Sequence, residues 1–555
     1  MIIHFFEIIS IFLLILLFGL SYIGYGKFFN NLIFKGESIV NYGQLGLLGI
    51  FFLIALSYFT SFFIPHNSLH NVLILTIGLI LFFFDKKKMD YQNLRLLFLI
   101  TIFTFLFFII SKNHDDFPYY HLPFALNLSE NKVSFGMGLL NYGYRHHSAL
   151  LFLNSLKFLP WLKYFLFNLP NYLILIFVNY ILLDNLIKNL KKKNIIFLLS
   201  LIFLTIINTK FTRLSEYGTD IAGQIILLVI IINFINILIV DKKIVNLYFN
   251  IFLLFIVLSF KVYFLIYFLL IPFVFYQLKL NPLKNKNLNL NAIICYLFFI
   301  SLFIIHNFIN TGCVIYPVEI TCIGDKFFWS LDSQEVIRND IWLESWAKAG
   351  ASPNFQVENL NEYIKGLNWV TNWYKNYFVG KVSDFFFIVI LINLIIFFSF
   401  NKKLNLKHDL VKVRKILIFI GSLALLIWFF KHPSLRYGGY LPVTIFLTSI
   451  FLFFYSIKNT KVNINKITNF FIILIIIIFN TKNVLRLELE FNRNDQYKFD
   501  NFPFYTVIDK KYESFSFENE TYMHTTNGYC WATPTPCSNT PRKIRVINNY
   551  IFFER

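Results

Sequence analysis

Long apolar runs, each followed by a short polar turn, set the pattern of this chain. Fourteen runs are apolar almost throughout. A helix needs about 20 apolar residues to cross a bilayer core roughly 30 Å thick, and shorter helices cross inside bundles. The pattern therefore predicts an all-α polytopic membrane protein, a helical bundle of about 14 transmembrane helices. The predicted spans are 3–23, 45–63, 69–84, 94–110, 169–187, 195–208, 221–240, 244–258, 260–278, 292–310, 382–400, 416–430, 441–455 and 467–480.

The apolar run 150–159 is too short to cross, so we expect an interfacial helix that lies along the membrane surface. Loops rich in Lys and Arg stay in the cytoplasm and orient the bundle. Fourteen spans place all the basic loops on one side, whereas a span at 150–159 would put the cluster at Lys188 opposite the cluster at Lys86. The basic loops are 86–88, 188–193, 242–243, 279–286, 402–415 and 458–466.

Composition agrees with the span pattern. The chain is 57% apolar and 14% charged, whereas soluble domains carry roughly a quarter charged residues. Its 20% aromatic residues exclude a disordered chain. The net charge of +20 arises largely in the predicted cytoplasmic loops, so the expected partner is the lipid bilayer and not nucleic acid.

Four segments follow from this topology. They are the N-terminal transmembrane helices (1–111), an outer loop with interfacial helices and an acidic motif (112–168), a transmembrane bundle with an outer loop at 311–381 (169–480), and a small outer C-terminal tail (481–555). The N-terminus has neither a basic region nor a cleavage site, so we expect the first span to be retained.

Four of the five cysteines fall in predicted outer segments. Cys313 and Cys322 share one loop, and Cys530 and Cys537 share the tail. Two close pairs on the outer side favour the disulfides Cys313–Cys322 and Cys530–Cys537 in an oxidising compartment. Four reduced thiols are the alternative.

The first outer loop opens with two adjacent acids, Asp115 and Asp116. Mutual repulsion and nearby hydrocarbon both raise the pKa of a carboxyl group toward the range of a general base. Alternatively, one acid caps the helix that Pro118 opens. His114 and His121 flank the pair and are candidates for the same pocket.

Arg145, His146 and His147 follow in the same loop. A guanidinium next to two imidazoles can hold a phosphate or help to bind a divalent ion. Contact with lipid head groups is the alternative. The histidines and acids of this loop are compatible with a divalent metal, but the sequence requires no cofactor.

Further charged residues lie at the outer ends of later spans. Arg213, Glu216 and Asp220 precede the span at 221–240. Lys261 stands between apolar runs, where it must either snorkel to the surface or find an anion. Arg436 belongs to a glycine-rich turn and could simply anchor head groups.

The chain lacks several well-known motifs. It contains no Walker A sequence, no HExxH and no nucleophile elbow. The spans also carry few midplane charges, which a transporter usually needs at its binding site. We therefore expect any chemistry to take place on the outer face.

The order of these parts resembles the GT-C superfamily of integral-membrane glycosyltransferases. An acidic motif in the first large outer loop precedes interfacial helices, a Lys at the outer end of a later span and a Pro-x-x-Arg-Tyr turn. The arrangement Asp-Asp…Tyr-x-x-Pro…Arg-His-His in 115–159 carries most of the likeness, which covers most of 94–480. Residues 530–537 resemble the Cys-Trp-x-x-Pro-x-Pro-Cys ending of uncharacterised bacterial multispanning proteins grouped near that superfamily.

The resemblance implies an inverting glycosyltransferase of cell-envelope polysaccharide biosynthesis. Such enzymes move a sugar from a polyprenyl-phosphate carrier to a hydroxyl of a glycan, lipid or protein acceptor, on the outer (periplasmic) face of the inner membrane. By the resemblance, Asp115 or Asp116 is the general base. The cations Lys261, Arg436 and Arg145 would neutralise the departing phosphate.

Two departures from the family pattern bear on this interpretation. Three extra spans precede the acidic loop, and the soluble domain of some relatives is reduced here to about seventy residues.

A polymerase or ligase of surface polysaccharide is one alternative function, and it need not depend on an Asp in the first loop. A flippase of lipid-linked oligosaccharide is another, and it would depend on residues within the spans. A purely structural envelope protein would leave the outer Asp, Arg and His residues unexplained.

Overall fold

The structure, a computed structural model of the chain, is mostly helical, with 73% of residues in helices. It describes residues 2–34, 41–84, 90–109, 116–212, 214, 218–239, 244–278, 289–350, 357–401, 404, 409–455, 464–493, 507–517 and 522–555. Within these ranges nine helices are long and apolar enough to cross a membrane, and five shorter apolar helices accompany them. The prediction of a polytopic helical membrane protein is therefore confirmed.

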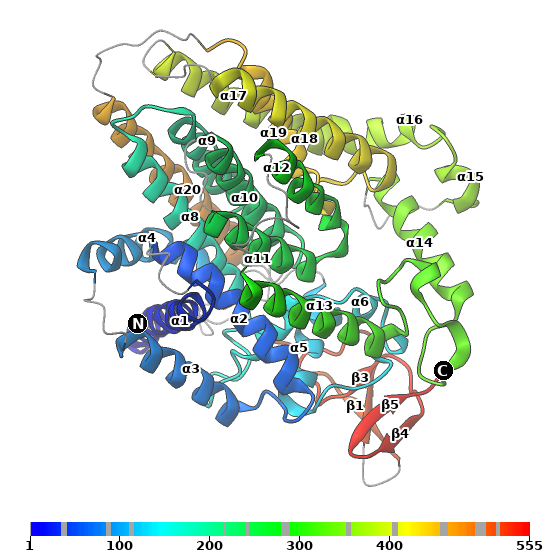
Figure 1. Cartoon of the computed structure of the whole chain (residues 1–555). Helices are drawn as coiled ribbons and strands as arrows, with labels where there is room; N and C mark the ends of the chain where they lie inside the picture. The colour runs from blue at the N-terminus through cyan, green and yellow to red at the C-terminus, as the bar shows by residue number, and fades with distance from the viewer. Residues whose placement is uncertain are drawn as a thin grey trace.

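The long helices form a bundle, with α1 to α4 along one edge and α17 to α19 along the opposite edge (Figure 1). A helix overlaps each of the predicted spans, and the span at 260–278 corresponds to η3 followed by α12. The bundle comprises α1 (Ile2–Ile33), α2 (Tyr42–Ser61), α3 (Ser68–Phe83), α4 (Tyr91–Ile109), α8 (Leu169–Asn189), α9 (Ile195–Lys210), α10 (Ile221–Ile239), α11 (Ile244–Phe260), η3 (Val262–Leu269), α12 (Leu270–Leu278), α13 (Leu290–Thr311), α17 (Ser383–Phe400), α18 (Asp409–Lys431), α19 (Tyr440–Phe451) and α20 (Asn465–Arg493).

Glycines allow α1 and α2 to approach each other closely. A Cβ on Gly26 of α1 would lie 1.8 Å from the carbonyl oxygen of Leu45 in α2. A Cβ on Gly49 of α2 would lie 1.9 Å from the carbonyl oxygen of Tyr22 in α1. Small residues at such crossings let transmembrane helices gain van der Waals contact along their backbones. The N-terminal helices are therefore packed backbone against backbone.

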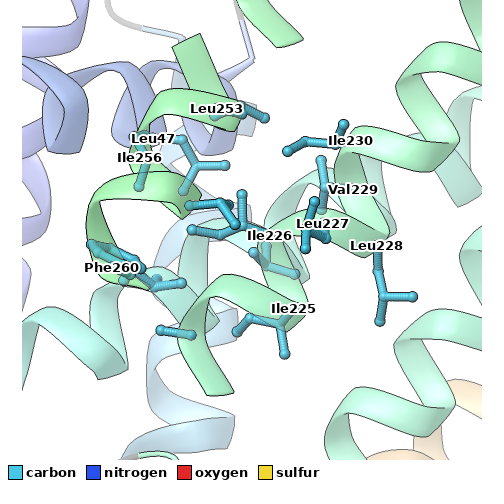
Figure 2. Close-up of a cluster of buried hydrophobic side chains, with 14 of the residues drawn as sticks. Leu47, Ile225, Ile226, Leu227, Leu228, Val229, Ile230, Leu253, Ile256 and Phe260 are labelled. Atoms are coloured by element: carbon cyan, nitrogen blue, oxygen red, sulfur yellow. The ribbon is translucent and has the colours of Figure 1, made fainter. Parts of the chain in front are cut away.

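A buried apolar cluster joins α10 to α11 and reaches α2 (Figure 2). Ile225 and Ile226 of α10 lie with Ile256 and Phe260 of α11, and all four side chains are buried. Asp220 directly precedes α10, and Lys261 directly follows α11. This packing therefore fixes the start of α10, next to Asp220, and the end of α11, next to Lys261.

The first connection contacts both the second long connection and the C-terminal tail, and we call the end of the bundle where these parts meet the loop face (Figure 1). The first connection contains η1 (Phe117–His121), α5 (Leu122–Glu130), η2 (Met137–Leu139), α6 (Tyr142–Arg145) and α7 (Ala149–Ser155). The prediction of a surface helix at 150–159 is wrong for α7. All seven of its residues are buried, because α2, α5, α8 and α11 pack around it.

A second long connection on the loop face runs from α13 to α17. The disulfide Cys313–Cys322 closes its first turn. Figure 1 shows α14 to α16 at the side of the bundle, near the end of α18. The elements are η4 (Glu319–Thr321), η5 (Gly324–Lys326), α14 (Ser333–Lys348), α15 (Leu360–Ile364), α16 (Val370–Trp373) and η6 (Tyr374–Val382).

The C-terminal tail adds a small β-structure to the helical fold. The predicted boundary at residue 480 falls inside α20, and strands follow that helix. In the first sheet β1 pairs antiparallel with β2 and β2 pairs parallel with β3, while β4 and β5 form an antiparallel pair. Figure 1 shows these strands beside α5 and α6. The strands are β1 (Tyr512–Ser516), β2 (Tyr522–Thr526), β3 (Cys537–Ser538), β4 (Ile544–Ile547) and β5 (Tyr550–Phe553).

We expect Gly49→Ala to destabilise the protein, because the added methyl group meets the backbone of α1. Overpacking of this kind costs about 1–3 kcal/mol. The measurement is the thermal unfolding midpoint in detergent. Gly380→Ala is the matched control, since a Cβ at Gly380 has no atom within 4 Å. Equal midpoints for the two variants would contradict the close crossing of α1 and α2.

Candidate functional site

Four charged residues from four separate connections meet on the loop face. Asp116 stands before η1, and Asp220 stands before α10. Lys261 lies between α11 and η3, and Arg436 lies in η7 (Leu435–Tyr437), between α18 and α19. We call these four residues the ion cluster. The sequence singled out each of them, and the structure brings them together.

Arg436 joins the two acids of the ion cluster. Its Nε donates to Oδ2 of Asp220 at 2.5 Å, and its terminal NH2 nitrogen donates to Oδ2 of Asp116 at 2.6 Å. Nζ of Lys261 lies 3.2 Å from Oδ1 of Asp220. Asp220 thus contacts both cations, whereas Asp116 contacts the cluster through Arg436.

Asp116 was expected either as a general base or as a helix cap, and the structure bears on the second of these two interpretations. Asp116 occupies the N-cap position of η1, but its side chain makes no capping hydrogen bond. Its carboxylate is directed to Arg436, which lies 320 positions farther along the chain. The carboxylate therefore belongs to the ion cluster and does not act as a helix cap.

Burial differs strongly between the two acids. The Asp220 side chain is 2% exposed, whereas the Asp116 side chain is 29% exposed. The Arg436 side chain, at 36% exposed, also reaches solvent. A ligand that approaches the ion cluster from outside therefore meets Asp116 and Arg436, and Asp220 lies behind them.

Several hydrogen bonds hold the turn that carries Arg436. Nε2 of Gln224 in α10 donates to the carbonyl oxygens of Leu435 and Arg436, at 3.3 and 3.1 Å. The indole nitrogen of Trp373 donates to the carbonyl of Pro433 at 2.7 Å. Gly438 ends η7 with a φ of +89°, a left-handed conformation that glycine adopts without strain. Hydrogen bonds from Gln224 and Trp373 therefore hold the backbone of the turn that carries the Arg436 guanidinium.

The two cations keep Asp220 ionised. Burial alone would raise the pKa of this carboxyl, but Lys261 and Arg436 outweigh burial and hold the pKa below its usual value. A carboxyl whose pKa is lower in the folded than in the unfolded state stabilises the fold above the unfolded value, about 4. The stability that Asp220 provides is therefore complete at neutral pH and is lost only in acid.

Neutral polar side chains surround the ion cluster. Burial, together with Lys261, lowers the pKa of His146 to about 3. Burial lowers the pKa of His432, whose ring centroid lies 6.3 Å from that of Tyr437, to about 4. Burial raises the pKa of Tyr437 to about 12 and moves the pKa of Tyr120 upward as well. At neutral pH these imidazoles and phenols are uncharged, so they can form hydrogen bonds with a ligand without adding charge.

Arg145 does not join the ion cluster. Its NH2 nitrogen forms an ion pair with Oε1 of Glu335 at 2.5 Å, and its Nε donates to the carbonyl of Gly138 at 2.9 Å. Glu335 is the anion that Arg145 contacts in the structure, and the expected role of Arg145 in binding the donor phosphate stays a prediction. The pair ties the first connection to α14.

His147 and His121, also expected in the pocket, are both buried side chains. Nε2 of His147 lies 2.8 Å from the hydroxyl of Tyr58, inside the bundle. His121 is buried, and its ring centroid lies 4.1 Å from that of Tyr120. Both pack within the first connection and its neighbouring helices. His146 is therefore the member of the His pair that lies near the ion cluster.

Four of the predicted site residues fall outside the described ranges: His114, Asp115, Arg213 and Glu216. Within the described part of the chain, no group of three or more His, Cys, Asp or Glu side chains is placed to hold a metal ion. The ion cluster itself holds two acids and two cations, so it is electrically balanced.

Sequence reasoning missed Gln224, Tyr120 and Tyr437 as parts of the site, and it missed Glu335 as the partner of Arg145. Glu335 lies in the first turn of α14, where an acidic residue is ordinary. Tyr120 and Tyr437 lie in the same sequence motifs as Asp116 and Arg436. Their short distance in sequence from these charged residues could have marked them as parts of the site. Gln224, one helical turn into an apolar span, was a second signal.

The fold and the ion cluster define a multi-pass helical membrane protein with a charged site at one end of its bundle. The chain belongs to the family described as Domain of unknown function (DUF8201), whose model matches residues 1–443. All four residues of the ion cluster fall within that match. No curated protein and no solved structure matches the chain.

We expect Asp220→Asn to destabilise the protein far more than Asp116→Asn. Removing the buried carboxylate leaves two cations without a partner, which costs about 3–5 kcal/mol. The more exposed pair of Asp116 with Arg436 is worth about 1 kcal/mol or less. Unfolding of both variants in mixed detergent micelles measures the difference. Equal losses of stability would show that Asp220 is not the anchor of the cluster.

Proposed function

We propose that this protein is a glycosyltransferase that moves a sugar from a polyprenyl-phosphate carrier to an acceptor hydroxyl. The observation that supports the proposal is the meeting of Asp116, Asp220, Lys261 and Arg436 on the loop face. Together they offer a partly exposed carboxylate next to a partly exposed guanidinium. The first can accept a proton, and the second can hold a phosphate.

The resemblance to the GT-C superfamily supports the same proposal. The proposal places fourteen spans in the inner membrane, with the loop face and the tail on the periplasmic side. Both disulfides lie in segments of the loop face, which suits an oxidising compartment. The acidic loop, the Lys after α11 and the Arg turn before α19 occur in the family's order.

In the proposed reaction, Arg436 exchanges one partner. Its Nε stays on buried Asp220, and its terminal nitrogen moves from Asp116 to the phosphate of the carrier. Fixed cations stabilise the negative charge that develops on this phosphate as it leaves. The same exchange ends the contact between Arg436 and the Asp116 carboxylate, so Arg436 no longer competes with the acceptor hydroxyl for that carboxylate oxygen.

The transfer itself is then a single displacement. Asp116 takes the proton of the acceptor hydroxyl, and the acceptor oxygen attacks the anomeric carbon of the sugar. The bond between that carbon and the phosphate oxygen breaks, and the electron pair stays on the polyprenyl phosphate. The new bond forms on the opposite face of the sugar, so the configuration inverts. Lys261 and Arg436 hold the product phosphate.

We expect Asp116→Asn to lower the release of polyprenyl phosphate at least a hundredfold, because a general base contributes about 10²–10⁴ in rate. The assay incubates the purified protein with a panel of labelled polyprenyl-phosphate sugars and measures the freed carrier. Asp325→Asn is the matched control, an exposed acid on the same face.

Two outcomes of this assay would contradict the proposal. If the Asp116→Asn variant retains full release, a polymerase or ligase that needs no acid in the first loop becomes the better interpretation. If no donor in the panel loses its carrier, while labelled oligosaccharide-lipid crosses vesicles that contain the wild-type protein, the flippase interpretation gains support.

A further inference from the structure

We propose that the loop closed by Cys530 and Cys537, here called the tail loop, is a positioning element of the site. Within it, Trp531 holds η1 in the place from which Asp116 reaches Arg436. The consequence for catalysis rests on the proposed glycosyl transfer. The positioning of η1 is a structural claim that stands apart from it.

Trp531 is buried and packs against the start of η1. The residue is 4% exposed and belongs to a separate apolar cluster, with Phe117, Leu122 and Phe167 among its members. Its ring centroid lies 6.3 Å from that of Phe117, edge to face. Its backbone N–H donates to the carbonyl of Pro118 at 3.1 Å. These contacts fall on the two residues that directly follow Asp116.

A second contact holds the far end of the same segment. The backbone N–H and the hydroxyl of Thr535 both donate to Oε2 of Glu130, at 2.9 and 2.6 Å. The side-chain amide of Asn131 donates to the Thr535 hydroxyl at 3.2 Å. Glu130 ends α5, so the tail loop is attached near both ends of the helical segment formed by η1 and α5.

The disulfide and the β-structure fix the tail loop itself. Cys530 and Cys537 are seven positions apart, and their bond limits the conformations that the loop can adopt. Beyond the loop, β3 pairs with β2, and the hydroxyl of Ser538 donates to the carbonyl of Leu140 at 3.2 Å. Trp531 and Thr535 are therefore presented to the first connection at a fixed spacing.

The tail loop reaches the site without touching its charged groups. The family match ends at residue 443, so Trp531 is supplied by a part of the chain beyond it. The 2.6 Å contact between Asp116 and Arg436 is a charge-assisted hydrogen bond, which requires close and well-aligned atoms, so a shift of η1 would break it. Trp531 is accordingly a positioning residue and not a catalytic one.

Hydrogen–deuterium exchange of the full-length protein in detergent tests the positioning. In Trp531→Ala, and separately in the double variant Cys530→Ser with Cys537→Ser, we expect at least tenfold faster exchange in 117–126. Exchange within α10 should stay at the wild-type rate. Trp531→Phe should restore most of the protection, because a ring still fills the cluster. Trp342→Ala, a change at a tryptophan 48% exposed on the same face, should alter neither segment.

Two exchange results would overturn the positioning claim. Wild-type protection of 117–126 in Trp531→Ala would show that the indole does not hold η1. Equal loss of protection in 117–126 and in α10, persisting in Trp531→Phe, would show that the tryptophan serves the fold as a whole.

The carrier-release assay tests the catalytic consequence. We expect Trp531→Ala to lower kcat about tenfold with less than a twofold change in KM, and Trp531→Phe to recover at least half of the activity. Unchanged kcat together with faster exchange would overturn the link between η1 and the reaction. If the wild-type protein releases no carrier, the proposed function fails, and the exchange experiment still decides the positioning.

Discussion

The buried carboxylate of Asp220 is the interaction on which the site depends. Two cations at the edge of an apolar bundle lose much of their hydration, and an isolated buried charge is costly. Asp220 contacts both of them, with Oδ1 toward Lys261 and Oδ2 toward Arg436. Its position is fixed in turn by the apolar packing between α10 and α11 (Figure 2). The dry core of the bundle therefore sets the geometry of a charged cluster at its end.

Arg436 extends this arrangement to the surface. One side of the guanidinium is held inside by Asp220, and the other meets Asp116 where both side chains reach solvent. The Arg436 guanidinium is thus held in place by Asp220, while its contact with Asp116 is open to exchange with a ligand. This arrangement suits a site in which an incoming anion takes the place of a carboxylate and leaves that carboxylate able to accept a proton.

The sequence predicted the helices well, because lipid requires long apolar runs and the chain supplies them in regular order. It also marked Asp116, Asp220, Lys261 and Arg436 individually, as charged residues at the outer ends of apolar spans. It could not show which charges pair. Asp220 and Arg436 are 216 positions apart, and the packing of α10 beside α19 brings them together.

In two places the structure shows contacts that the sequence did not indicate. The run 150–159 was expected at the membrane surface, but an interfacial helix needs a polar face, and α7 is apolar on nearly all sides. Arg145 was expected at the phosphate because it lies near the acidic loop in sequence. Its partner Glu335 belongs to an amphipathic helix of a distant connection, and no local pattern links the two. The β-structure of the tail likewise depends on docking against the first connection.

An experimental structure of the protein with a bound polyprenyl phosphate tests the central claim most directly. The account predicts that the phosphate contacts Arg436 and Lys261, that the contact between Arg436 and Asp116 is broken, and that the contact between Arg436 and Asp220 is kept. A phosphate bound away from these residues, with both contacts of Arg436 intact, would contradict it.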